Sequence, residues 1–161
     1  MHTSPQRIER AVPRPRSNDG DDRAEAGVDQ PAERLRLPLR LNAAFSLVSG
    51  AALLVAGGPL GSLMDVDQVW LLRLIGVGVV LFGVDVWFVA SRPTGHLVQH
   101  SAMVTAADFA WVAATVVVIA LGLVNTAGAV LCVAVALAVD GFGTAQFFAR
   151  RALVRALAPA D

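Results

Sequence analysis

The sequence contains no lysine, a single cysteine and none of the common catalytic or nucleotide-binding motifs. Because Cys132 is alone, a disulfide framework, a CxxC redox pair and a cysteine zinc site within one chain are excluded. HExxH, GxSxG, P-loop and dinucleotide-binding patterns are all missing. We therefore expect no enzyme activity, and the sequence predicts neither a cofactor nor a metal site.

Apolar runs are also missing from the first 36 residues. Pro5, Pro13, Pro15 and Pro31 interrupt any helical pattern there, and the few apolar residues are isolated. A segment that cannot bury an apolar face does not recover the entropy lost on ordering. Residues 1–36 are therefore predicted to form a disordered tail, and residues 37–161 a single domain.

That domain is dominated by four continuous apolar runs. The whole chain is 55% hydrophobic and has a mean hydropathy of +0.60. A helix needs about 20 apolar residues to cross ~30 Å of hydrocarbon at ~1.5 Å per residue. Because the runs do not alternate in polarity, helices are favoured over a barrel. We predict an all-α integral membrane four-helix bundle in a lipid bilayer, with spans at about 39–56, 69–90, 102–124 and 127–148.

The arginines that flank these runs predict the orientation. A formal net charge of zero conceals their uneven distribution, and no nucleic-acid partner is expected. Asp65 and Asp67 lie in the connection at 58–68, which has no basic residue. By the positive-inside rule, both termini are predicted to be cytoplasmic in a multi-pass protein of the cytoplasmic (inner) membrane. The arginines on the predicted cytoplasmic side are Arg34, Arg36, Arg40, Arg92, Arg150, Arg151 and Arg155.

Three aspartates inside the runs are the main candidates for function. Counting residues from the predicted span ends puts Asp85, Asp108 and Asp140 about 7, 9 and 12 Å below the cytoplasmic boundary. A charge at the centre of a span costs ~2.5–3.5 kcal/mol, so three incidental carboxyls would be surprising. Each belongs to a helical stripe of polar or small residues, as do Asn42 and Thr144. We predict that these stripes face inward and form an intramembrane polar cluster.

Two functions remain open for such a cluster. The aspartates can hold helices together in a structural or interaction subunit of the membrane. Alternatively, they can serve an oligomeric proton- or cation-linked small transporter, since their carboxyls titrate. Small residues spaced by four, such as Ala106, Ala110 and Ala114, permit close helix contact inside one bundle or with a membrane partner or second copy. The first function is the main expectation, and the biochemical role is not identified by any motif.

Two segments also carry a resemblance. RLNAAFSLVSG at residues 40–50, and RLIGVG at 73–78 followed by LFG at 81–83, resemble a group of uncharacterised small bacterial four-span integral membrane proteins. The resemblance covers the first two predicted spans. It implies a four-helix membrane fold and carries no known activity, cofactor or site residue.

Overall fold

A computed structural model describes the backbone of residues 19–158 and the side chains of residues 29–158. This part of the chain is helical, without strands, and four of its helices are long and apolar enough to cross a membrane. The predicted all-α, multi-pass membrane architecture is confirmed. The helices are α1 (Asp19–Val55), α2 (Gly57–Met64), α3 (Val69–Ala90), α4 (Thr94–Ala120) and α5 (Thr126–Ala156).

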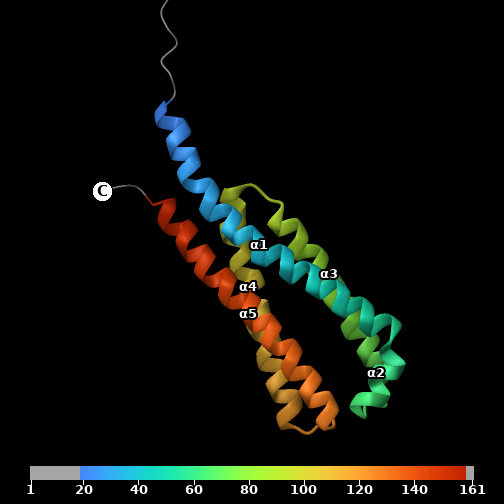
Figure 1. The fold of residues 1–161 in the computed structure, drawn as a ribbon. Coiled ribbons are helices and arrows are strands. Elements are labelled where there is room, and N and C mark those ends of the chain that lie inside the picture. Colours follow the sequence, from blue (N-terminus) through green and yellow to red (C-terminus); the bar gives the residue numbers. More distant parts are fainter. Residues whose placement is uncertain (1–18, 159–161) are drawn as a thin grey trace, which may run out of the picture.

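The four long helices form two antiparallel pairs that meet along α1. Figure 1 shows α1 beside α3, and α4 beside α5, with α1 crossing α5. The described start of α1 and the end of α5 lie at one end of the molecule, and α2 lies at the other. We call these the terminal end and the α2 end. Because α3 packs almost entirely against α1, much of its surface remains uncovered.

Glycines explain how closely α1 and α3 approach. A Cβ on Gly50 of α1 would lie 2.8 Å from the carbonyl oxygen of Gly76 and 2.8 Å from a methyl of Val80. A Cβ on Gly83 of α3 would lie 3.1 Å from the carbonyl oxygen of Ala43. These separations leave no room for a side chain, so the three glycines allow direct backbone contact between the two helices.

The buried apolar core lies toward the terminal end. Leu35 and Leu39 of α1 are completely buried, as are Leu97 of α4 and Leu153 of α5. Val89 near the end of α3 joins the same cluster. Residues from all four long helices therefore converge here, and this end holds the two pairs together.

The start of α1 differs from the prediction of a disordered tail through residue 36. Residues 1–18 lie outside the described part, but the chain is helical from Asp19 onward. Pro31 and Pro38 are accommodated inside α1, and Pro38 is buried. Each proline removes one helical hydrogen bond. Leu35 between these prolines, and Leu39 just after, are completely buried, and their packing contacts offset part of that loss.

The other boundaries agree with the sequence to different degrees. The second predicted span, 69–90, coincides with α3. α4 and α5 extend beyond the third and fourth predicted spans at the terminal end, and α4 ends at Ala120, before the predicted residue 124. The segment after α1, which was expected to be a loop, contains α2. Pro59 lies in the first turn of α2, where backbone N–H groups have no partner within the helix, so the N–H that proline lacks is not missed.

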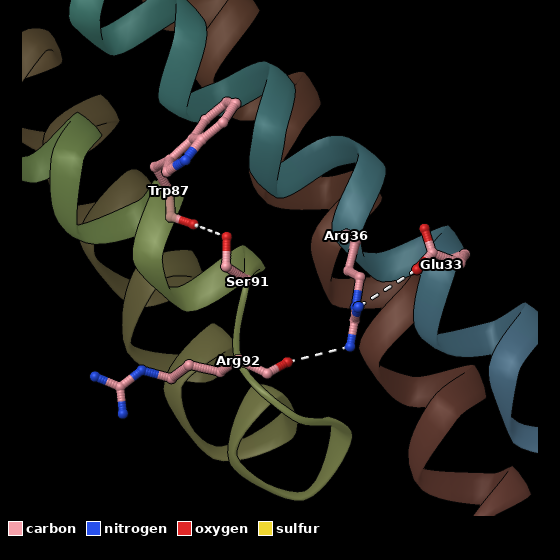
Figure 2. A network of polar contacts seen from close by, with 5 residues as sticks. All are labelled: Glu33, Arg36, Trp87, Ser91 and Arg92. Atoms are coloured by element: carbon pink, nitrogen blue, oxygen red, sulfur yellow. Dashed lines mark hydrogen bonds and ion pairs between the residues drawn. The ribbon is translucent and has the colours of Figure 1, made fainter.

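Polar contacts tie the connections to the helices at both ends. At the terminal end, Arg36 of α1 donates from Nη2 to the carbonyl oxygen of Arg92 at 3.1 Å and pairs with Glu33 at 3.4 Å, as Figure 2 shows. A cation is favourable at this position because α3 ends there with unpaired carbonyl groups. At the α2 end, the Asn125 side chain donates to the carbonyl oxygen of Leu63 at 2.9 Å and caps α5 by accepting from the Gly128 N–H.

Candidate functional site

A buried carboxyl, Asp108 of α4, lies where α1, α4 and α5 meet. Its side chain is 2% exposed. Asn42 of α1 donates from Nδ2 to both carboxyl oxygens, at 3.0 and 2.8 Å. Gln146 of α5 donates from Nε2 to Oδ2 at 3.1 Å. Two amides from two other helices therefore hold this one carboxyl.

Hydroxyl groups complete this polar cluster. The hydroxyl oxygen of Thr105, one turn before Asp108, lies 3.2 Å from Oε1 of Gln146 and 2.9 Å from the carbonyl oxygen of Ser101. The hydroxyl has one proton and can donate it to only one of these two acceptors at a time. Ser46 of α1 donates to Oδ1 of Asn42 at 3.4 Å. We call Asn42, Ser46, Thr105, Asp108 and Gln146 the Asp108 cluster. All five residues are buried.

Local sequence explains how three helices reach one point. Ser101, Thr105 and Asp108 are spaced by four and three residues, which places them on one face of α4. On α5, Gly143 faces α4 beside this point, since a Cβ built there would lie 3.4 Å from the Cβ of Asp108. Gln146, three residues later, then reaches the carboxyl.

The chemistry of the Asp108 cluster is that of an acceptor surrounded by neutral donors. No arginine or histidine within residues 29–158 forms an ion pair with Asp108, and that region contains no group of three or more His, Cys, Asp or Glu side chains placed to hold a metal. The amide contacts use both carboxyl oxygens. Buried polar groups satisfied in this way rigidify a structure and fix helix register, so the arrangement is suited to locking α1, α4 and α5 together.

The other predicted site residues do not join this cluster. Asp85 on α3, and Asp140 and Thr144 on α5, are exposed. In the described part of the chain, neither Asp85 nor Asp140 has a hydrogen-bond or ion-pair partner. Asn42 and Asp108 therefore face inward, whereas the three exposed residues do not. Asp140 is not a polar tie between helices of the same chain.

Helix register nevertheless places the three carboxyls at similar heights. Asp108 lies opposite Asn42 on α1, and the ring of Phe142 lies 5.7 Å from that of Phe45. Gly83 packs between Ala43 and Leu47. Counting along the helices puts Asp85 opposite position 43 of α1 and Asp140 opposite position 47. All three carboxyls therefore lie within about 8 Å of one another along the axis of the bundle.

Sequence reasoning missed Gln146, which it did not count among the candidates. The signal was present, because Gln146 is the one amide inside the fourth apolar run. A search that scores amides together with ionisable groups would have found it, since both form strong interhelical hydrogen bonds. Thr105, which also contacts Gln146, was not among the predicted site residues either.

Comparison of the chain with known protein families, curated proteins and solved structures finds no match. Function must therefore be argued from the geometry of the three aspartates. They occupy three environments: closed and hydrogen-bonded for Asp108, and open on α3 and on α5 for Asp85 and Asp140.

Proposed function

We propose that the chain is an interaction subunit of the cytoplasmic membrane, which joins a further transmembrane element through the outer face of α3. The observation that carries this proposal is Asp85, an exposed carboxyl in the interior of a membrane-spanning helix. On insertion scales a carboxylate costs ~2.5–3.5 kcal/mol at the centre of a span and less toward its ends. Asp85 lies about 7 Å inside the end of α3, so part of this cost applies to it. A neighbouring transmembrane helix that supplies a donor or a cation removes most of that cost.

The surroundings of Asp85 support a helix as the partner. Gly78 lies two helical turns away on the same side of α3, and a Cβ built there would meet nothing within 4 Å. An open glycine allows another backbone to approach closely. Large apolar residues exposed beside it, including Leu74 and Leu81, supply contact area.

A second uncovered surface on α4 is consistent with an interaction role. Ala106, Ala110 and Ala114, spaced by four residues, are all exposed. The corresponding pair on α1, Ser46 and Gly50, is buried inside the chain. The alanine face is thus left available for contacts outside this bundle.

Charge at the two ends supports the proposed orientation, with both termini in the cytoplasm. The terminal end carries Arg36, Arg92 and Arg150, whereas Asp65 and Asp67 lie beside α2. Positive residues flank the cytoplasmic ends of spans in most multi-pass proteins.

The alternative function is an oligomeric proton- or cation-linked transporter. It would require a titratable group that both sides of the membrane can reach in turn. Asp108 is enclosed by its amide donors, and no residue of the Asp108 cluster lines the groove between α4 and α5 or the groove between α1 and α3. For Asp108, this arrangement favours a structural role in an interaction subunit over a role in transport.

Cross-linking in native membranes tests the proposal. Gly78→Cys places a thiol on the proposed contact face, in a background where Cys132→Ala removes the native thiol. We expect a cross-linked species that Asp85→Leu abolishes and Asp65→Asn preserves, because Asp65 lies outside the spans. The proposal is overturned if Gly78→Cys gives no adduct with a second copy or another membrane protein, or if Asp85→Leu leaves the adduct unchanged.

A further inference from the structure

A groove of about 310 Å³ runs between α4 and α5, with Asp140 as its one charged residue. Its size is at the lower end of the range for small-molecule sites, ~300–1,000 Å³. The rims are open, since Val116 is 60% exposed and Leu137 is 67% exposed. The rest of the wall is formed mainly by Val112, Thr115 and Ile119 of α4 and by Val133 of α5.

The charge of Asp140 is not balanced by the described part of the chain. No basic side chain there forms an ion pair with it. Arg150, on the same helix, lies ten residues away, or about 15 Å, and donates instead to the carbonyl oxygen of Val98 at 2.9 Å. Residues 29–158 therefore leave room for a cation from another source at the groove.

A second groove provides an internal comparison. It is nearly the same size, about 300 Å³, and lies between α1 and α3, where Leu47, Val84, Trp87 and Phe88 line it. None of these residues is charged. Both grooves have apolar walls and similar volumes, so lipid acyl chains fit either one. The feature that distinguishes the α4/α5 groove is its carboxyl.

From this combination we infer that the α4/α5 groove binds an organic cation with an apolar body, which pairs its charge with Asp140. The apolar walls contact the body of the ligand, and the carboxylate selects the sign of its charge. In surroundings of low dielectric constant, an opposite charge is attracted more strongly than in water. A neutral ligand would leave the carboxylate unpaired, and an anion would be repelled.

An inorganic cation does not fit the same groove. Hard metal ions require about six or more oxygen ligands. Here the carboxyl is joined only by the Thr115 hydroxyl, which already donates to the carbonyl oxygen of Trp111 at 2.9 Å. This inference is independent of the proposed function, because it concerns α5 and Asp140, whereas the proposed contact concerns α3 and Asp85.

The test uses two probes of the same shape and opposite charge, tetraphenylphosphonium and tetraphenylborate. The full chain in phosphatidylcholine nanodiscs is titrated with each probe, and empty nanodiscs measure partition into lipid. We expect saturable binding of the phosphonium at one site and none of the borate. Asp140→Asn should weaken phosphonium binding about tenfold or more, because it removes the charge and keeps the shape.

Two further variants separate a specific site from a general effect. Asp85→Asn removes an exposed carboxyl at a similar height on α3, and we expect unchanged binding. Ala136→Leu narrows the groove while Asp140 remains, and we expect weaker binding. Thermal unfolding of each variant in detergent checks that the fold is retained.

The inference is overturned by equal binding of the two probes, by no saturable binding of the phosphonium, or by binding that Asp140→Asn does not change. A polyleucine transmembrane peptide with one central lysine forms the last arm. If that peptide binds in an Asp140-dependent manner while the phosphonium does not, the groove is a helix-docking site and the small-molecule inference is wrong.

Discussion

The Asn42 side chain on α1 donates to both carboxyl oxygens of Asp108 on α4, across 66 positions of sequence. The two residues are 0% and 2% exposed. The contact fixes both the rotation and the height of α1 relative to α4. Because Gln146 binds the same carboxyl from α5, one aspartate sets the register of three helices.

Breaking this contact should destabilise the fold without affecting the exposed aspartates. We expect Asn42→Leu and Asp108→Leu each to reduce stability, and the double variant to show a coupling of ~0.6–2 kcal/mol, the range for hydrogen bonds between membrane helices. Equilibrium unfolding in mixed micelles gives the four free energies of the cycle. Asp85→Asn is the control, since that carboxyl has no hydrogen-bond partner among residues 29–158. Additive single effects would contradict the assigned role.

A packing test concerns the contact between α1 and α3. Gly50→Ala would place a methyl 2.8 Å from the carbonyl oxygen of Gly76, so we expect a loss of ~1–3 kcal/mol from overpacking. Gly78→Ala meets nothing within 4 Å. It should leave stability unchanged or raise it by ~0.5–1 kcal/mol, because alanine favours a helix more than glycine does. Similar melting temperatures for the two variants would rule out close packing at Gly50.

A matched pair of leucines tests the buried start of α1. Leu35 is 0% exposed and Leu37 is 60% exposed. Leu35→Ala should cost ~2–5 kcal/mol of unfolding free energy, as expected for a core leucine, whereas Leu37→Ala should have little effect. Thermal unfolding in detergent distinguishes them. Equal effects would mean that the terminal-end core does not include α1 before residue 38.

Truncations extend that test. Deleting residues 2–18 should leave stability unchanged, because their isolated apolar residues offer no face to bury. Deleting residues 2–35 removes Ala32 and Leu35 from the core and should lower the melting temperature. If both truncations behave like the full chain, the helical segment before residue 36 contributes nothing to the fold.

Reporter fusions test the orientation. A fusion after Asp161 should report a cytoplasmic location, and one inserted between Asp65 and Asp67 an external location, as the arginine distribution predicts. An external C-terminus would reverse the assignment of both ends of the molecule.

The sequence predicted the helices better than their rotations. The bounds of α3 could be predicted because Gln68 and Arg92-Pro93 interrupt an otherwise apolar segment. The start of α1 could not, because whether Pro38 ends a helix or is buried within one depends on the packing around Leu35 and Leu39.

Rotation is the harder problem in a span that is apolar on all sides. The same reasoning predicted inward faces for Asn42, Asp108, Asp85 and Asp140, whereas the structure buries the first two and exposes the other two. In a soluble helix the polar face would indicate the exterior. Here apolar residues cover both faces, and only the positions of neighbouring helices decide which aspartate is enclosed.

The unbroken course of α1 has a mechanical consequence. A helix of 37 residues is about 55 Å long, roughly 25 Å more than the ~30 Å hydrocarbon layer. The part of α1 beyond that layer is therefore a helical arm that continues into the segment carrying Asn42, with Pro31 and Pro38 before that residue. A torque applied to that arm by a binding partner would turn Asn42 relative to Asp108. Because Asp108 also binds Gln146, such a movement would alter the register of α1 relative to both α4 and α5.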